Sequence, residues 1–153
     1  MVEVPHVLVG AAIAAKVGNP ALALPLALAS HFVLDLVPHW NPSIYTQLNK
    51  EGRVAPQTMR LILADSVLAV VVGVTIALLF LPDVGRALIV LVGSFLGVLP
   101  DVLEIPYYFW NIKHPLMVRY VEFNHSLQTN APFVPGIATQ IVVSLAAVWW
   151  IFT

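Results

Sequence analysis

The sequence predicts an all-α integral membrane protein, a helical bundle of about five helices in which two hairpins are followed by a C-terminal helix. Of its 153 residues, 59% are hydrophobic and only 10% are charged, whereas soluble domains carry about 25% charged residues. Crossing a bilayer takes about 20 mostly apolar residues. Four windows meet this length, at about 20–39, 60–82, 86–110 and 132–152. We therefore expect residues 1–153 to form a single transmembrane domain.

The first hairpin is expected from helices at about 5–17 and 20–37, joined by the turn-forming run GNP at 18–20. Pro5 suits the first turn of a helix, and Pro38 discourages helix before it. The first helix is short for a bilayer span. The sequence therefore leaves open whether this helix crosses the membrane completely.

The second hairpin is expected from helices at about 57–81 and 86–110, joined by the run PDVG at 82–85. Pro100 and Pro106 fall inside the second of these helices, where proline removes a backbone donor and bends the chain. We therefore expect kinks near the end of that helix.

The remaining segments are a polar loop at 40–56, an interfacial helix at about 115–127 and a last helix at about 133–152. Trp149 and Trp150 suit an anchoring position at the membrane interface. If all five long helices span, the N-terminus and both long loops share one side of the membrane.

Charge predicts which side that is. The long-loop side holds five lysines and arginines against two on the other side, which favours it as the cytoplasmic face of the inner (plasma) membrane. The net charge of −1 gives no indication of nucleic acid as a partner, and the absence of cysteine excludes disulfides and thiolate ligands.

The run SHFVLDLVPH places His31, Asp35 and His39 four residues apart, on one face of a helix. In a regular helix these positions span about 12 Å, so one metal ion cannot contact all three. His31 and Asp35 can chelate one ion. Asp35 can also bridge to a second ion that His39 helps to hold.

Folding each hairpin about its turn places further polar residues level with one another. His6 mirrors His31 across the first turn, and Asp65 mirrors Asp101 across the second turn. Both pairs are expected toward the side of the long loops. The sequence therefore predicts one polar cluster between the two hairpins.

The energetic cost of buried acids favours a metal in this cluster. Each ionised acid near the bilayer centre costs about 2.5–3.5 kcal/mol, and no lysine or arginine lies inside the helices close to these acids. A divalent cation supplies the missing positive charge. Imidazole and carboxylate ligands suit Zn²⁺, with Mn²⁺ or Fe²⁺ as alternatives, as one or two ions.

We expect each polar residue of the cluster to have a role in the site, but a purely structural role stays open for several of them. His31 with Asp35 can instead be a hydrogen-bonded packing pair, and Asp65 can be an interfacial acid that a helix dipole favours. Glu104 and Asp65 are the candidate catalytic carboxylates, with Glu104 as a general base. The expected metal ligands are His6, His31, Asp35, His39, Asp101 and His125. The cations expected to attract a substrate head group are Arg60, Lys113 and Arg119.

The same motifs carry a resemblance to a known family. The chain has an early histidine in PHVLVGAA, the run SHFVLDLVPHW, LPD at 99–101 and a late NHS at 124–126. This pattern resembles the bacterial and archaeal membrane-bound metal-dependent hydrolases, whose inner-membrane members include a LexA-regulated putative hydrolase. The resemblance implies a helical membrane fold and a hydrolase. Where this chain has EFNHS, members of the family often have a basic residue and threonine before the late histidine.

We therefore expect an integral-membrane hydrolase in which a divalent metal activates water against a lipid-like or amphiphilic ester or phosphoester. The expected partner is a membrane lipid or another amphiphile. A divalent-cation or proton transporter is the first alternative, because ligands enclosed by opposed hairpins are also a transporter design. A non-catalytic scaffold, in which polar residues hold helices together, is the second.

Overall fold

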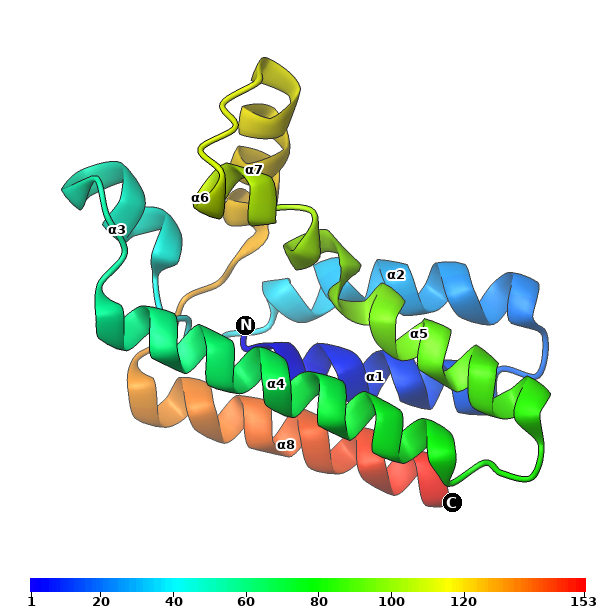
Figure 1. Cartoon of the computed structure of the whole chain (residues 1–153). Helices are drawn as coiled ribbons and strands as arrows, with labels where there is room; N and C mark the ends of the chain where they lie inside the picture. The colour runs from blue at the N-terminus through cyan, green and yellow to red at the C-terminus, as the bar shows by residue number, and fades with distance from the viewer.

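Every regular element of the protein is a helix, and the only β-type pairing is an isolated bridge between His39 and Asn130. The structure is a computed structural model that describes residues 1–153. The helices are α1 (Glu3–Lys16), α2 (Pro20–Leu36), α3 (Ile44–Glu51), α4 (Pro56–Leu78), α5 (Val84–Val102), α6 (Ile105–Phe109), α7 (Pro115–Leu127) and α8 (Phe133–Phe152). Figure 1 shows the five longer apolar helices, α1, α2, α4, α5 and α8, running side by side.

Three stretches are long and apolar enough to cross a membrane: α4, the Val84–Phe109 stretch that contains α5 and α6, and α8. Helix α2 is apolar but has only 17 residues. These lengths are consistent with a membrane protein, as the composition predicts.

Helix α1 is the central element and packs against α2, α4, α5 and α8 (Figure 1). Its 14 residues give a length of about 21 Å, which is shorter than the bilayer hydrocarbon core of about 30 Å. Neighbouring helices cover much of its surface, so α1 is a short helix enclosed by the bundle.

Small residues allow α1 and α5 to approach closely. A Cβ atom built on Gly97 would collide with the backbone oxygen of His6, and one on Gly93 would collide with Ala14. Glycines four residues apart are a common solution for close helix crossings in membranes. This crossing brings the backbone of His6 against α5, and it thereby positions the polar cluster.

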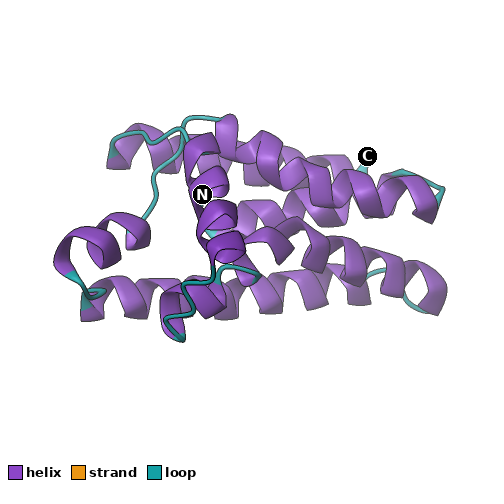
Figure 2. Ribbon diagram, turned by 90° about the horizontal axis from the view of Figure 1, so that it is seen from above, coloured by secondary structure: helices purple, strands orange, loops and turns teal.

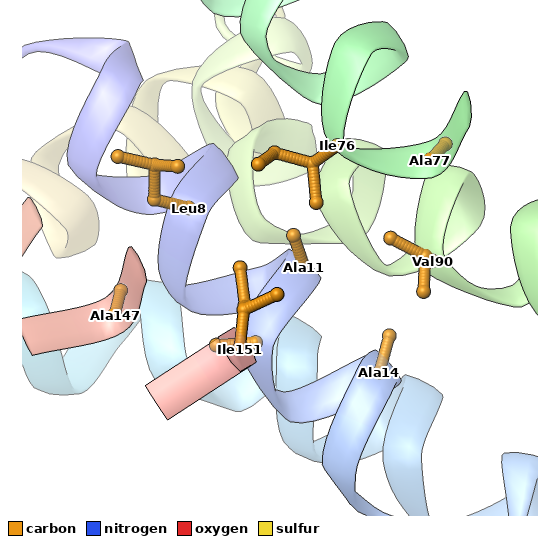
Figure 3. Close-up of a cluster of buried hydrophobic side chains, with 9 residues drawn as sticks. Leu8, Ala11, Ala14, Ile76, Ala77, Val90, Ala147 and Ile151 are labelled. Atoms are coloured by element: carbon orange, nitrogen blue, oxygen red, sulfur yellow. The ribbon is translucent and has the colours of Figure 1, made fainter. Parts of the chain in front are cut away.

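The apolar core lies at the end of the bundle that holds the two interhelical turns. Figure 3 shows side chains from α1, α4, α5 and α8 meeting there, among them Leu8, Ile76, Val90 and Ile151. No polar side chain belongs to this cluster. The polar residues are instead concentrated toward the other end.

That other end carries the N-terminus together with α3, α6 and α7 (Figures 1 and 2). The two tight turns, Val17–Asn19 and Leu79–Asp83, lie at the opposite end, where Figure 1 also places the C-terminus. The bundle is therefore polar at one end and apolar at the other.

The predicted count of five helices is wrong, because the segments between the long helices also fold into helices. Helix α3 forms inside the loop predicted at 40–56, and Gly52 ends it in a left-handed conformation (φ 70°) that suits glycine. The predicted helix at 86–110 continues through Pro100 but is interrupted after Val102, and α6 restarts with Pro106 in its first turn. The interfacial segment expected at about 115–127 is α7.

Candidate metal centre

Four buried polar side chains meet where α1 packs on α2. His6 lies in the first half of α1, and His31 and Asp35 lie one turn apart on α2. His39 follows the end of α2, beyond Pro38. Each of the four is at most 1% exposed. Groups this polar are costly to bury without partners, so their contacts decide what the site can do.

Hydrogen bonds to the backbone determine which nitrogen of His31 and His39 carries the proton. Nδ1 of His31 lies 2.9 Å from the carbonyl oxygen of Gly97, and Nδ1 of His39 lies 2.8 Å from that of Val37. Since a carbonyl oxygen only accepts, each Nδ1 is the donor, and in the neutral ring Nε2 keeps its lone pair.

Both of these lone pairs face the same carboxylate. Nε2 of His31 lies 3.4 Å from Oδ2 of Asp35, and Nε2 of His39 lies 4.0 Å from Oδ1. Neither Nε2 atom has a hydrogen-bond partner. Acceptors that face one another repel unless a cation lies between them. A metal ion or a proton on the imidazole would remove this repulsion, and a backbone-bonded Nδ1 with a free Nε2 is common in metal-binding histidines.

His6 and Asp101 complete the cluster. The ring of His6 stacks on that of His31 with centroids 4.2 Å apart, so the two histidines lie at one depth, as the mirror pattern predicts. Nε2 of His6 lies 3.5 Å from Oδ1 of Asp35, and Nε2 of His31 lies 3.7 Å from Oδ1 of Asp101. Neither ring nitrogen of His6 has a hydrogen-bond partner.

One ligand atom each from His6, His31 and Asp101 lies within 4.8 Å of the other two, so this group can hold a metal ion. Two ligands of one tetrahedral zinc ion are separated by roughly 3.4 Å. Within this group, Nε2 of His31 and Oδ1 of Asp101 are 3.7 Å apart, close to that value. A divalent ion therefore fits this donor set with small side-chain movements.

A backbone amine also contacts the cluster. The α-amino group of Met1 donates to Oδ1 of Asp35 at 2.8 Å in a buried position. Lysine and arginine side chains, the counter-charges considered from the sequence, do not include this amine. The amine occupies Oδ1, whereas Oδ2 stays directed at His31.

Glu104 follows Asp101 by three residues, between α5 and α6, and is only 6% exposed. Its Oε1 accepts a hydrogen bond of 2.8 Å from the amide of Asn124 in α7. The hydroxyl of Tyr120, also in α7, donates to the carbonyl oxygen of Pro100 at 3.0 Å. These bonds fix α7 to the end of α5 and orient the carboxylate of Glu104.

Asp65 makes a structural contact with α1, which differs from both the catalytic role and the interfacial role expected from the sequence. Its Oδ2 accepts a hydrogen bond of 2.6 Å from the backbone N–H of Glu3, at the start of α1. The first N–H groups of a helix have no partner within the helix. Asp65 of α4 therefore caps the N-terminus of α1, and it is not among the three residues whose ligand atoms converge.

The remaining site candidates lie apart from the converging histidines. His125 stacks on Tyr45 of α3, with ring centroids 4.0 Å apart, and partial burial lowers its pKa below the usual histidine range. Arg60, Lys113 and Arg119 are all exposed. The ammonium of Lys113 lies 3.2 Å above the ring of Tyr107.

Gln140 is a residue that the sequence analysis did not single out. Its Oε1 accepts from the backbone N–H of Val2 at 2.9 Å, and its Nε2 donates to the carbonyl oxygen of Trp40 at 3.1 Å. It thereby joins α8 to the start of α1 and to the segment after His39. An amide inside an apolar helix is the signal that could have found it.

A cavity of about 790 Å³ begins beside the cluster and extends between α4 and α5. Asp101 belongs both to the cavity wall and to the metal-binding group. Glu104 and His125 also line the cavity. The cavity thus gives a molecule of ligand size access to one side of the cluster.

We compared the chain with models of known protein families, with curated proteins and with solved structures. None of them matched.

Proposed function

We propose that the protein is an integral-membrane, metal-dependent hydrolase of a lipid-like or amphiphilic ester or phosphoester. The observation that carries the proposal is the set of buried Nε2 atoms of His6, His31 and His39, none of which has a hydrogen-bond partner. In the neutral rings of His31 and His39, the backbone bond at Nδ1 leaves Nε2 with its lone pair.

The ion we expect is Zn²⁺, held by His6, His31 and Asp101. Two imidazoles, a carboxylate and one open position form a common catalytic zinc geometry. Mn²⁺ and Fe²⁺ accept the same donors. A second ion between Asp35 and His39 has less support, because Oδ1 of Asp35 already accepts from an ammonium group.

A divalent ion in this position would supply an electrophile and lower the pKa of a coordinated water to about 7. Glu104 is the group that would accept the proton, as a general base. Asn124 donates to one of its oxygens, and Glu104 is one of the residues that line the cavity. The burial of Glu104 excludes bulk water from this proton transfer.

Measuring the metal content of the purified protein tests whether the cluster binds a metal ion. The full chain would be purified in detergent without chelators and analysed for metals by plasma mass spectrometry. We expect at least one divalent ion per chain and a large loss in His31→Ala. His114→Asn is the matched control, because His114 is exposed and Asn preserves its capping bond to the N–H of Leu116.

An activity assay tests whether the protein is a hydrolase. Long-chain aryl esters and phosphoesters would be offered to the metal-loaded protein in vesicles, and Glu104→Gln should lower turnover by about 10²–10⁴-fold without removing the metal. Bound metal with no hydrolysis, but with ion flux into liposomes, would favour the transporter. An absence of metal under all conditions would favour the scaffold.

A further inference from the structure

The cavity is polar at one end and apolar along the rest of its length. Near the cluster its wall contains Glu3, Asp65, Asp101 and Glu104. Further from the cluster it follows α4 to Val74 and α5 to Leu91, and most of its lining residues there are apolar. From Asp65 to Val74 the helix rises about 14 Å. This shape matches a molecule with one long apolar tail and a polar head.

Helices α4 and α5 expose large apolar side chains, as expected of surfaces in contact with lipid. Val70 and Phe95 line the cavity and are 66% and 52% exposed. The apolar part of the cavity is therefore continuous with the lipid-facing surface. A tail can enter it sideways from the membrane, without passing through water.

The charge of the polar end specifies the head group. Four carboxylates line the cavity, and none of the seven lysines and arginines does. Met1 also lines it, but its α-amino group is already paired with Asp35. Arg60, Lys113 and Arg119, which the sequence analysis expected to attract an anionic head, are outside this lining. With a divalent ion held by Asp101, three further carboxylates, Glu3, Asp65 and Glu104, still line this end. A phosphate placed here would face their like charges, whereas an ammonium group would face opposite charges.

The side chain of Glu3 indicates that the head group donates hydrogen bonds. Its backbone N–H is bonded to Asp65, but its side-chain Oε2 is buried and has no hydrogen-bond partner. A buried acceptor without a donor is costly. Since Glu3 lines the cavity, a ligand with N–H groups would satisfy it.

We infer that this cavity binds a single-tailed amphiphile whose head carries an ammonium group, with the tail between α4 and α5. The inference rests on the proposed function in that this amphiphile is the substrate class, and it narrows the expected substrate to an ester whose polar end carries an amine. Binding itself needs neither metal nor turnover.

Photo-crosslinking tests the inference directly. The full chain in phosphatidylcholine nanodiscs would be irradiated with hexadecylamine carrying a diazirine on its tail, and with the matching hexadecyl phosphate. We expect adducts concentrated on α4 and α5 and a preference for the amine of roughly tenfold, from the opposite-charge attraction at the head. Equal labelling by the two probes would overturn the choice of head group. Labelling of α8 as strong as that of α4 and α5 would overturn the tail site.

Four variants sharpen the test. Val98→Trp fills the cavity at a half-buried lining position, and its neighbour Leu99→Trp is the control, half-buried but outside the lining. We expect Val98→Trp to lose the α4–α5 adducts and Leu99→Trp to keep them. Val74→Trp, at the far end, is a second obstruction if Val98→Trp fails to fold. Glu3→Gln should retain tail labelling but reduce the preference for the amine.

The result can be separated from that of the proposed function. Protein that binds no metal but prefers the amine probe would refute the hydrolase and support the amphiphile site. Protein that binds metal but is labelled equally by both probes would support the metal site and refute the preference for an ammonium head. The labelling is therefore repeated after treatment with a chelator.

Discussion

At the scale of single residues, the decisive feature is the direction of imidazole nitrogens. His31 and His39 both use Nδ1 on a backbone carbonyl, which leaves Nε2 directed at Asp35. A scaffold would be better stabilised by the opposite arrangement, in which the ring donates to the carboxylate. The observed arrangement is suited to a cation.

Asn124 has a residue-level prediction of its own. Asn124→Leu removes the donor to buried Glu104, and leaving such a group unsatisfied costs about 1–3 kcal/mol. We expect a lower melting temperature and lower turnover but unchanged metal content, because Asn124 contacts Glu104 and not the histidines. Ser126→Ala on the exposed face of α7 is the control. Loss of metal in Asn124→Leu would contradict this division of roles.

Histidine spacing and hairpin symmetry predicted part of the residue-level geometry. His6 and His31, which were expected at the same depth on either side of the first turn, form a stacked pair. The α-amine at Asp35 and the cap that Asp65 gives to α1 could not be predicted, because both involve the backbone of residues 1–3. Hydropathy and side-chain spacing do not record backbone donors.

At the scale of elements, the α1–α5 crossing determines whether the cluster forms. His6 is carried by α1, and the carbonyl that orients His31 belongs to Gly97 of α5. A β-carbon at Gly97 would collide with the backbone of His6. The same glycine therefore permits the crossing and orients a ligand.

Gly97→Val tests this coupling. Overpacking costs about 1–3 kcal/mol, and we expect the separated helices to lose metal as well as stability. Gly18→Ala in the first turn is the matched control, because a β-carbon there meets nothing within 4 Å. Metal content and thermal unfolding would be measured together. Full metal retention in Gly97→Val would show that the crossing does not position the site.

The long helices were predictable because apolar length is recorded directly in the sequence. The helix expected at 133–152 coincides with α8. The helix expected at 57–81 is α4, which ends three residues earlier than expected, at Leu78. Helix α3 was missed because its composition is polar, and tertiary contacts hold it in place. Gln47 of α3, for example, donates to Thr58 and accepts from the N–H of Ala55.

At the scale of the whole molecule, the bundle separates an apolar end from a polar end. The apolar core joins α1, α4, α5 and α8 (Figure 3). The start of α1, which carries His6, lies at the end of the bundle with α3, α6 and α7 (Figure 1). This polarity suits a site that receives an amphiphile near one membrane interface. A transport site would be expected near the bilayer midplane.

Membrane orientation is the first molecular prediction. The excess of positive charge predicts that α3 faces the cytoplasm and the first turn faces outward. The chain has no cysteine, so Lys50→Cys and Gly18→Cys can each be labelled alone with an impermeant maleimide in spheroplasts. We expect labelling of Gly18→Cys before lysis and of Lys50→Cys only afterwards. The reverse pattern would place the site outside.

The effect of metal removal on stability is the second prediction for the whole molecule. A ligand at about 100 times its dissociation constant stabilises the folded state by about 2.7 kcal/mol. For a chain of this size that corresponds to a fall in melting temperature of roughly 5–10 °C when the metal is chelated. Restoring Zn²⁺ should restore the melting temperature, and it should have no effect in His31→Ala. An equal response of the wild type and His31→Ala would place the metal elsewhere.

The most direct measurement is X-ray absorption at the metal edge on protein purified without chelators. We predict a nitrogen and oxygen shell at about 2.0–2.1 Å with the multiple-scattering signature of at least two imidazoles, and loss of that signature in His6→Ala. A metal shell without imidazole, or no more metal in the wild type than in His31→Ala, would contradict the assignment of this buried cluster as a metal centre.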